Sequence, residues 1–318
     1  MWRICPPERT KKYVKMAVLN LSVLTQYAWI KKGRIVMKIL ITGATGQLGY
    51  DCAEECKARG HEVHGVSSEL FPLSDENVMR AVLEATEPDA ILHTAAYTAV
   101  DKAEDEPSLC RKINAAGTEI LARLARERNA KLLYISTDYV FPGTGDAPHE
   151  TNALTAPHNV YGASKLAGEE AVQQHLENYF IVRTSWIFGT HGQNFVKTML
   201  ELAKSYKSLS VVADQIGSPT YTRDLAPLLA DMLESEKYGI YHATNEGFCS
   251  WAKFAAEIFR QAGKDVNVTS VPSHMYPTKA VRPKNSRLSK KSLDEAGFHR
   301  LPPWEDAVGR FLEELKGS

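Results

Sequence analysis

Hydrophobic and polar residues follow two distinct patterns along the chain from Met37 onward. Short, almost continuous hydrophobic runs are followed by longer stretches in which hydrophobic residues recur at helical spacing. This succession is typical of strand–helix–strand units with parallel strands, and the continuous runs indicate strands covered by helices on both faces. The pattern predicts five strands, over Lys38–Thr42, Glu62–Val66, Ala90–Thr94, Lys131–Ser136 and Tyr179–Arg183.

Helical spacing fills the intervals between these strands and continues after the last of them. Gly60 and Pro88 are suitable stop signals after the first helix and before the third strand. The spacing predicts helices over Leu48–Arg59, Glu76–Ala85, Ser108–Arg128, Ala163–Leu176, Phe195–Tyr206, Thr222–Glu234 and Ser250–Gln261.

The order of these elements predicts an α/β fold of the Rossmann type, with a doubly wound parallel sheet. We expect residues 37–183 to form the sheet domain. Residues 184–318 are expected to form mainly a smaller C-terminal lobe, with segments that return to the Rossmann core. Residues 270–287 are rich in Pro, Ser, Lys and Arg, which suits either a flexible linker or a lid.

Residues 1–36 differ from the rest of the chain. Basic residues come first, and an apolar patch from Met16 to Ile30 follows them. Polar residues interrupt this patch, which is too short and too polar to span a bilayer, and no small-residue cleavage site precedes Lys31. Since Met37 begins an ordinary first strand, we interpret residues 1–36 as a dispensable extension or a misassigned start.

Composition narrows the function and the compartment. Among 318 residues, 38 basic side chains balance 38 acidic ones, so nothing favours a nucleic-acid or membrane surface. The five cysteines form neither a CxxC pair nor a secreted disulfide framework, which favours ordinary packing in a reducing cytoplasm. No metal site is expected, because His61 and His64 lack a carboxylate or thiol at ligand spacing, and both are expected at exposed or edge positions.

A glycine-rich turn lies between the first predicted strand and the first predicted helix. Gly43 suits a tight turn, Gly46 lets the backbone approach a pyrophosphate, and Gly49 permits close contact between helix and strand. This position predicts a dinucleotide site, which makes residues 37–183 an NAD(P)-binding domain. The second strand ends at Val66-Ser67-Ser68, whose hydroxyls suit either NAD or NADP. The full turn is Gly43-Ala44-Thr45-Gly46-Gln47-Leu48-Gly49.

A catalytic pattern follows further along the chain. Thr137 comes at the end of the fourth strand, Tyr161 and Lys165 form a YxxxK pair at a helix start, and Asn114 completes the set. The YxxxK spacing puts its tyrosine and lysine on one helix face. The ammonium and a cationic nicotinamide would both favour phenolate, so we expect the pKa of Tyr161 to fall toward neutrality. Thr137 would orient a substrate carbonyl or hydroxyl.

Together, the glycine turn, the Ser-Thr strand end and the YxxxK pair resemble the extended short-chain dehydrogenases from Met37 almost to the C-terminus. Longer motifs narrow the resemblance to the dTDP-4-dehydrorhamnose reductases. These motifs are Ala95-Ala96-Tyr97-Thr98-Ala99-Val100-Asp101-Lys102-Ala103-Glu104, Ser136-Thr137-Asp138-Tyr139-Val140-Phe141, Arg183-Thr184-Ser185-Trp186, Asn194-Phe195, Asp214-Gln215-Ile216-Gly217-Ser218-Pro219-Thr220 and Arg282-Pro283-Lys284-Asn285-Ser286-Arg287-Leu288.

The resemblance implies an enzyme of dTDP-rhamnose biosynthesis. It would reduce the C4 keto group of dTDP-4-dehydro-β-L-rhamnose to give dTDP-L-rhamnose, with NADPH or NADH as hydride donor. The implied catalytic set is Thr137, Tyr161 and Lys165, with Tyr161 as proton donor. The implied cofactor-binding residues are Gly43, Gly46, Gln47, Leu48, Ala95, Ala96, Tyr97 and Lys165. The implied substrate-binding residues, mostly in a substrate-binding C-terminal lobe, are Thr98, Trp186, Asn194, Gln215, Thr220, Arg282 and Arg287.

Some of these residues also suit structural roles. Trp186 would serve equally as a core aromatic residue, and Arg282 and Arg287 as solvated loop charges, although two arginines can hold a diphosphate bidentately. Many relatives carry an acidic residue near the adenine, but here Pro72 stands at that place. We expect Asp75 to cap the following helix instead.

Several rival functions share these motifs. A nucleotide-sugar 4,6-dehydratase would need a glutamate where Tyr139 follows Asp138, which counts against it. A 4-epimerase, another nucleotide-sugar reductase and a non-catalytic dinucleotide-binding regulatory subunit stay open, although the complete Thr–Tyr–Lys set argues against the last. The resemblance also implies a sugar 3,5-epimerase that supplies the substrate, and it permits a homodimer. Asp51 alone does not support an interfacial magnesium ion.

Overall fold

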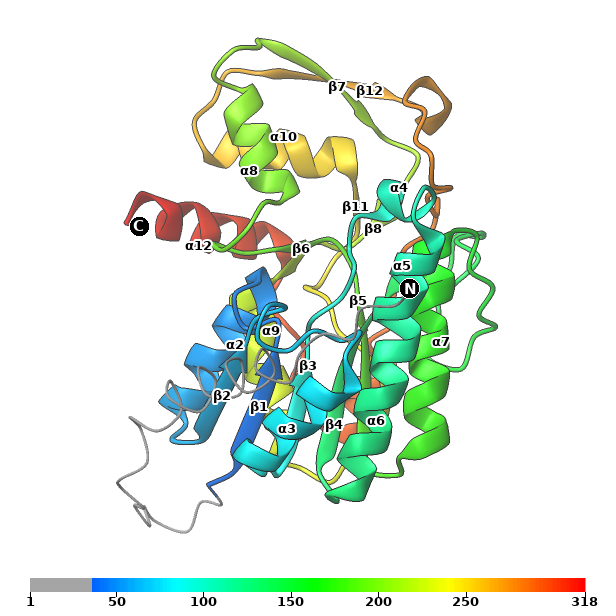
Figure 1. Cartoon of the computed structure of the whole chain (residues 1–318). Coiled ribbons are helices and arrows are strands. Elements are labelled where there is room, and N and C mark those ends of the chain that lie inside the picture. Colours follow the sequence, from blue (N-terminus) through cyan, green and yellow to red (C-terminus); the bar gives the residue numbers. More distant parts are fainter. Residues whose placement is uncertain (1–35, 318) are drawn as a thin grey trace, which may run out of the picture.

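A six-stranded parallel sheet forms the centre of the molecule (Figure 1). The computed structural model describes residues 36–317, so the N-terminal extension up to residue 35 lies outside the described residues. The strands lie in the order β10-β5-β4-β3-β1-β2. Their bounds are β1 Lys38–Thr42, β2 Glu62–Val66, β3 Ala90–His93, β4 Lys131–Thr137, β5 Tyr179–Thr184 and β10 Gly239–His242.

The predicted doubly wound Rossmann-type sheet is confirmed, and its first five strands agree with the prediction to within one residue. The sixth strand, β10, was not predicted. It is a short edge strand that pairs only with β5, and its sequence Gly-Ile-Tyr-His has just two large hydrophobic residues. So short a run carries too little of the strand pattern to be recognised alone.

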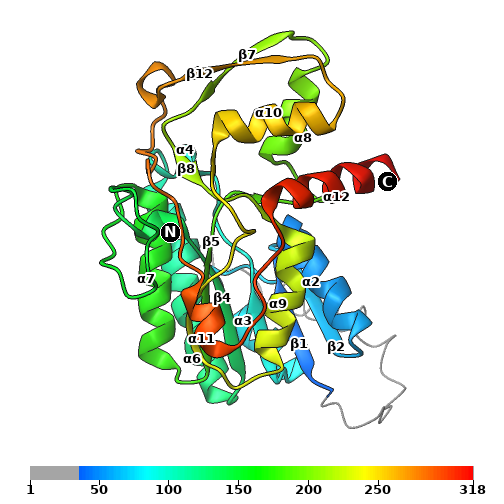
Figure 2. The same ribbon diagram turned by 180° about the vertical axis from the view of Figure 1, so that it is seen from behind.

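Helices cover both faces of this sheet, as the hydrophobic strands require (Figures 1 and 2). Alternate β1 side chains take part in two separate cores, with Ile39 and Ile41 on one face and Leu40 on the other. The first face packs against α2 (Gln47–Ala58), α9 (Thr222–Leu233) and α11 (Lys291–Ala296), of which the last two come from the C-terminal half of the chain. The second face packs against α3 (Glu76–Thr86), α6 (Gly117–Glu127) and α7 (Val160–His175).

The predicted long helix over Ser108–Arg128 is interrupted. It consists of α5 (Pro107–Arg111), a π-helical turn (Lys112–Ala116) and then α6. The turn contains the buried Asn114, whose side chain accepts a hydrogen bond from the Tyr97 amide (2.7 Å) and donates one to the Tyr97 carbonyl (3.0 Å). Such π-turns often lie at functional sites. The short helix α4 (Val100–Ala103) precedes α5.

A smaller C-terminal lobe lies above the carboxyl ends of the strands (Figure 1). It has its own hydrophobic core, built around Phe188, Phe254, Trp304 and Phe311. Within the described residues, no helix is both long enough and apolar enough to cross a membrane. The lobe and its junction contain β6 (Ile187–Phe188), α8 (Phe195–Leu202), β7 (Ser208–Val212), β8 (Ile216–Gly217), β9 (Thr220–Tyr221), β11 (Cys249–Ser250), α10 (Trp251–Gln261), β12 (Asn267–Val271) and α12 (Trp304–Lys316).

Several residues were predicted to have structural rather than catalytic roles. Cys52, Cys56, Cys110 and Cys249 are free and buried. His61, expected at an exposed or edge position, directly precedes the edge strand β2 but is buried, because its ring accepts a hydrogen bond from the Met37 amide and pairs with Glu234. Asp75 caps α3, as predicted, by accepting hydrogen bonds from the amides of Asn77 and Val78. These contacts belong to the scaffold.

Candidate active site

The candidate site lies at the point where the order of the strands in the sheet reverses. From β1 the chain crosses to β2 on one side, and from β3 it crosses to β4 on the other, which opens a crevice at the carboxyl ends of β1 and β3. The loops after these strands touch: Thr94 Oγ1 donates to the Thr42 carbonyl (2.6 Å). Gly43 turns the chain with a φ of 69°, and a Cβ there would lie 3.0 Å from the Ala95 backbone. The crevice therefore needs glycine at position 43.

The glycine turn has the form of a phosphate cradle. Gly46 caps α2 without a side-chain hydrogen bond, and the first turn of the helix carries no acidic residue. A Cβ on Gly49 would lie 2.2 Å from the Gly43 carbonyl oxygen, so only glycine lets the helix start this close to the strand. The positive end of the helix dipole and the unpaired first-turn amides fit a dinucleotide pyrophosphate.

Gln47, predicted to bind the cofactor, and Asn194, predicted to bind the substrate, are hydrogen-bonded to each other. The Gln47 side-chain oxygen accepts hydrogen bonds from the Gly189 amide (3.1 Å) and from the Asn194 side chain (2.9 Å). Asn194 also caps α8 by accepting a hydrogen bond from the Lys197 amide. Gln47 and Asn194 thus join the phosphate turn to the C-terminal lobe. The Leu48 side chain is buried in the first core, so only its backbone, in the first turn of α2, is available to a ligand.

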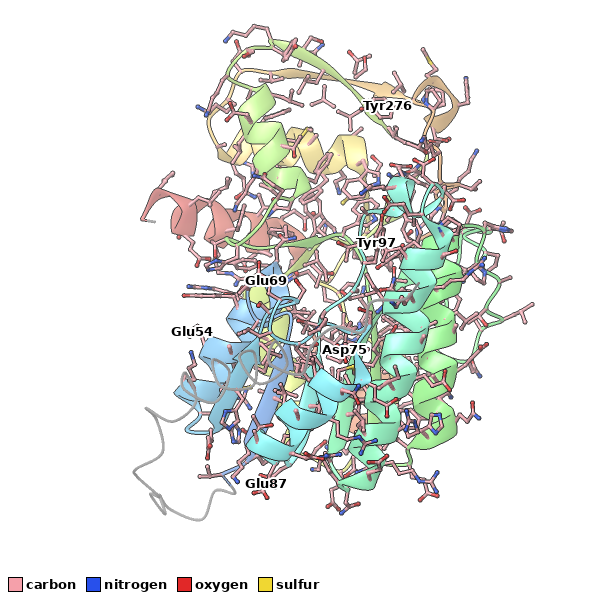
Figure 3. The ribbon with its side chains drawn as sticks, viewed as in Figure 1. Glu54, Glu69, Asp75, Glu87, Tyr97 and Tyr276 are labelled. Atoms are coloured by element: carbon pink, nitrogen blue, oxygen red, sulfur yellow. The ribbon has the colours of Figure 1, made fainter. Side chains whose placement is uncertain are left out.

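The loop after β3 lines the other side of the crevice. Ala95, Ala96 and Tyr97 are half-buried and Thr98 is exposed. Asn114 holds the Tyr97 backbone, and the Tyr97 hydroxyl donates to Glu106 (2.8 Å). Tyr97 lies between the sheet domain and the upper lobe, whereas Glu87 marks the opposite end of the strands (Figure 3).

The structure brings the predicted catalytic residues together. Thr137 ends β4, and α7 begins beside it with Asn159 as N-cap, which accepts a hydrogen bond from the Gly162 amide (2.7 Å). Tyr161 stands in the first turn of α7, hydrogen-bonded to Thr137. Lys165 follows one turn later and is almost completely buried. Thr137 and Tyr161, which are 24 residues apart in the sequence, therefore lie next to each other, and Lys165 lies one turn further along α7.

Tyr161 is held as a neutral phenol. Burial raises its pKa most strongly and the nearby Asp138 raises it further, whereas the hydrogen bond with Thr137 lowers it. The expected lowering toward neutrality is therefore wrong for the chain alone, because burial outweighs the favourable contacts. A high pKa keeps the proton on the phenol, which is the form that a proton donor requires.

Burial disfavours the charged forms of Lys165 and Asp138 as well. Burial lowers the pKa of Lys165 to about 7, while Glu169 and Cys110 oppose this shift. The ammonium lies 3.9 Å from the centroid of the Tyr134 ring. Asp138 accepts a hydrogen bond from Thr137 Oγ1 (3.0 Å), and burial raises its pKa to about 6. Both groups therefore titrate near neutrality.

A cavity of about 580 Å³ is lined by Asn159, the N-cap of α7, among other residues. Arg282 and Arg287 both line it, together with Tyr139, whose ring packs edge-on against that of Tyr161 with centroids 5.7 Å apart. Arg282 also donates to the Tyr139 hydroxyl (3.2 Å) and pairs with Asp101 (2.6 Å). The cavity thus offers guanidinium groups for an anion beside the candidate proton donor.

Comparisons with known proteins identify the family. Residues 37–316 match the family model described as the RmlD substrate binding domain. The chain is 41% identical over 293 residues to the dTDP-4-dehydrorhamnose reductase of Salmonella typhimurium, covering 88% of this chain and 98% of that protein. This chain belongs to the dTDP-4-dehydrorhamnose reductase family.

Two further matches agree with the assignment. The spore coat polysaccharide biosynthesis protein SpsK of Bacillus subtilis is 39% identical over 281 residues, covering 88% of this chain and 99% of that protein. The crystal structure of the dTDP-4-dehydrorhamnose reductase of Bacillus anthracis in complex with NADP has a TM-score of 0.86 and 42% identity, covering 88% of this chain and all of that one.

Some residues expected to bind substrate in this reductase also make structural contacts. Thr220 is fully buried and its hydroxyl donates to the Ser185 carbonyl (2.7 Å), while Gln215 is buried nearby. Trp186 has a left-handed backbone (φ 49°) and stacks on Trp251, with ring centroids 3.7 Å apart. Its half-buried ring therefore also belongs to the lobe core. Arg287 lines the cavity and donates to Asn285 (2.9 Å).

The segment expected to be a linker or a lid crosses the site of this reductase. Asp101 accepts hydrogen bonds from Arg282 and from the Ala280 amide (3.1 Å), and Lys279 pairs with Asp105 (2.5 Å). These contacts tie residues 279–282 to the region of α4. Sequence reasoning missed the Asp101–Arg282 pair because its members lie 181 residues apart and neither stands in a local pattern that links them.

Proposed function

We propose that this protein reduces the C4 keto group of dTDP-4-dehydro-β-L-rhamnose to give dTDP-L-rhamnose, with NADPH or NADH. One observation carries the proposal: Thr137 and Tyr161 lie together where β4 ends and α7 begins, Lys165 follows one turn later, and the arginine-lined cavity lies beside Tyr139. The names of the relatives support the same substrate. A 4,6-dehydratase fits less well, because Tyr139 occupies the position of the second acid.

The chain's own residues move one proton in this reaction. Tyr161, kept protonated by burial and by Asp138, gives its proton to the oxygen that was the C4 carbonyl. Thr137, hydrogen-bonded to Tyr161, fixes the position of that oxygen. Lys165 places a positive charge on the same helix face and stabilises the phenolate that remains.

The cofactor-binding residues follow the two loops of the crevice. When bound, the dinucleotide supplies the hydride. Gly43, Gly46, Gln47 and Leu48 would hold its pyrophosphate at the start of α2, Ala95, Ala96 and Tyr97 would line the opposite wall, and Lys165 would hold the nicotinamide ribose. The relative from Bacillus anthracis is bound to NADP. Ser67 and Ser68 carry no charge, so we expect both cofactors to be accepted.

The substrate would occupy the cavity of about 580 Å³. Arg282 and Arg287 would bind the diphosphate, with Arg282 exchanging part of its contact with Asp101 for the ligand. The open edge of Trp186 would contact the deoxysugar, and Thr98 would reach it from the loop after β3. Asn194, Gln215 and Thr220 would act by holding the surrounding loops, since their side chains are buried.

We further propose a cytoplasmic homodimer that receives its keto sugar from a 3,5-epimerase. The balanced charge and the free cysteines support the compartment. The instability expected of a keto sugar supports a nearby supplier.

The test is oxidation of NADPH or NADH with dTDP-4-dehydro-6-deoxyglucose as starting sugar, with and without a 3,5-epimerase. We expect oxidation that requires the epimerase and falls by about a thousandfold or more in Tyr161→Phe, since the variant has no proton to donate. Dinucleotide binding by the variant, followed by fluorescence, is the control for folding. Tight dinucleotide binding by the wild-type protein without turnover would instead favour the regulatory-subunit function.

A further inference from the structure

Helix α7 carries a third buried polar residue in line with Tyr161 and Lys165. Glu169 follows Lys165 by four residues, so it lies on the same helix face one turn further on. Its side chain is only 1% exposed, and an ionised carboxylate is rarely so buried without partners. The proposed proton transfer does not use this residue directly, so its presence beneath the site needs a reason.

Two partners fix the Glu169 carboxylate. Arg183 of β5, itself 4% exposed, pairs with it at 2.6 Å and contributes two further hydrogen bonds through Nε (2.9 and 3.2 Å). Ser136 Oγ donates to the same carboxylate at 2.5 Å. With this ion pair and the serine hydrogen bond, the buried carboxylate has the partners that such a group requires.

This network is linked to the catalytic set at two points. Ser136 directly precedes Thr137, so its bond to Glu169 anchors the end of β4. Glu169 is also the group that most strongly favours the protonated form of Lys165. Arg183 is held in turn by the Thr151 carbonyl (2.9 Å) and by the face of the Phe141 ring, so the network is rigid.

The other groups that face Lys165 do not provide such a charge. From β3, His93 is neutral, because burial and Lys165 itself lower its pKa to about 3. From α5, Cys110 favours the protonated form of Lys165 less than Glu169 does, and burial raises the pKa of its thiol. From β4, Tyr134 offers the face of its ring, and burial raises the pKa of its hydroxyl as well.

We infer that Glu169, held by Arg183 and Ser136, is a positioning residue that keeps the buried Lys165 protonated and in place during the reaction. The inference rests on the proposed function for the role of Lys165. The effect of the buried Glu169 charge on the titration of Lys165 can be measured without any turnover.

The first experiment measures the titration of Lys165 directly. Protein labelled with ¹³C at the lysine Cε is titrated by NMR in the absence of cofactor, and the Lys165 signal is assigned by its loss in Lys165→Arg. We expect Glu169→Gln, which keeps the shape but removes the charge, to lower the pKa of Lys165 by about one pH unit or more. Glu170→Gln, at an exposed position on the same helix, is the matched control and should leave the signal unchanged.

Because Glu169→Gln leaves Arg183 buried without its partner, this variant can fail to fold. The double variant Glu169→Gln/Arg183→Gln removes both charges and allows an amide–amide hydrogen bond. We expect the pKa of Lys165 to fall in the double variant as well. A Lys165 titration like that of the wild type, in whichever of the two variants folds, would overturn the inference.

A second experiment distinguishes the effect of the Glu169 charge from the structural role of its hydrogen bonds. Ser136→Ala removes one hydrogen bond but keeps the carboxylate, so we expect the Lys165 titration to stay within about 0.3 pH unit of the wild type while kcat falls severalfold. In the reductase assay, the pH profile of kcat/KM should move to lower pH in Glu169→Gln but not in Ser136→Ala. A loss of activity with unmoved profiles in both variants would mean that Glu169 is structural only. Absence of turnover in the wild type would count against the proposed function and leave the NMR result standing.

Discussion

At the scale of single residues, Asp138 shows how a buried charge sets the state of its neighbour. Its carboxyl is almost fully buried beside Thr137 and raises the pKa of Tyr161. A reductase needs its tyrosine protonated before hydride transfer, whereas an alcohol oxidation needs phenolate. The acid next to the threonine therefore favours reduction.

Replacing Asp138 by asparagine should make Tyr161 more acidic. We expect the pKa of the Tyr161 hydroxyl, followed by NMR of tyrosine-labelled protein without cofactor, to fall, because the raised pKa loses its second largest cause. We also expect kcat/KM at neutral pH to fall by about tenfold, since Thr137 loses an anionic hydrogen-bond acceptor. Asp265→Asn, exposed in the lobe, is the control. A Tyr161 titration like that of the wild type would mean that Asp138 acts only on Thr137.

The parts of the site that sequence predicted are those with a local pattern. The glycine turn and the Tyr161–Lys165 pair each follow from a fixed spacing, and the structure places them at the crevice. The Gln47–Asn194 bond joins residues 147 positions apart, so no local pattern contains it. The buried hydroxyl of Thr220 could not be foreseen either, because burial depends on how the lobe packs.

At the scale of elements, α7 is positioned by its first turn. A Cβ on Gly162 would lie 2.3 Å from the Tyr139 carbonyl oxygen, so the helix can approach the turn after β4 only without a side chain here. That approach brings Tyr161 to Thr137. Element boundaries were predicted closely where hydrophobic runs were clear, and wrongly at Ser108–Arg128, where Asn114 bonds to the Tyr97 loop within a π-turn.

Gly162→Ala should damage activity more than stability. The added methyl must displace the start of α7, and a shift of about 1 Å at Tyr161 is expected to lower kcat by about a hundredfold. The free energy of unfolding should fall by only about 1–3 kcal/mol, as for other overpacked sites. Urea unfolding and the reductase assay measure the two effects. Ala163→Ser, at the exposed neighbouring position, is the comparison, and an equal loss in both variants would contradict this account.

At the scale of the whole molecule, two neutral histidines lie deep in the fold. His93 ends β3 between the hydroxyls of Thr42 and Thr118, and His242 ends β10. Burial lowers the pKa of each to about 3 from an ordinary value of 6.5. The unfolded chain therefore binds more protons than the folded one between these values. Their contribution to stability is present above pH 6.5 and is lost as the pH falls toward 3.

Acid should consequently destabilise the wild type more than a variant without one of these histidines. His93→Gln loses contacts at neutral pH, but it no longer resists protonation. We expect its deficit in the free energy of unfolding to shrink between pH 6.5 and 4, by up to about 1.4 kcal/mol per pH unit. Urea unfolding at several pH values measures the deficit, and His299→Gln, at an exposed position, is the control. A deficit that stays constant or grows would contradict the assignment of a neutral His93.

The hydrogen bonds between Gln47 and the Gly189–Asn194 loop have a consequence for how the two ligands bind. A dinucleotide bound at the start of α2 would contact Gln47, whose side chain also holds this loop. Any ordering of Gln47 by the dinucleotide would therefore also order the loop of the C-terminal lobe. By thermodynamic linkage the effect is mutual: whatever factor the dinucleotide adds to the affinity for the sugar nucleotide, the sugar nucleotide returns. The two ligands of this reductase are thus expected to bind cooperatively, although they need not touch at this point.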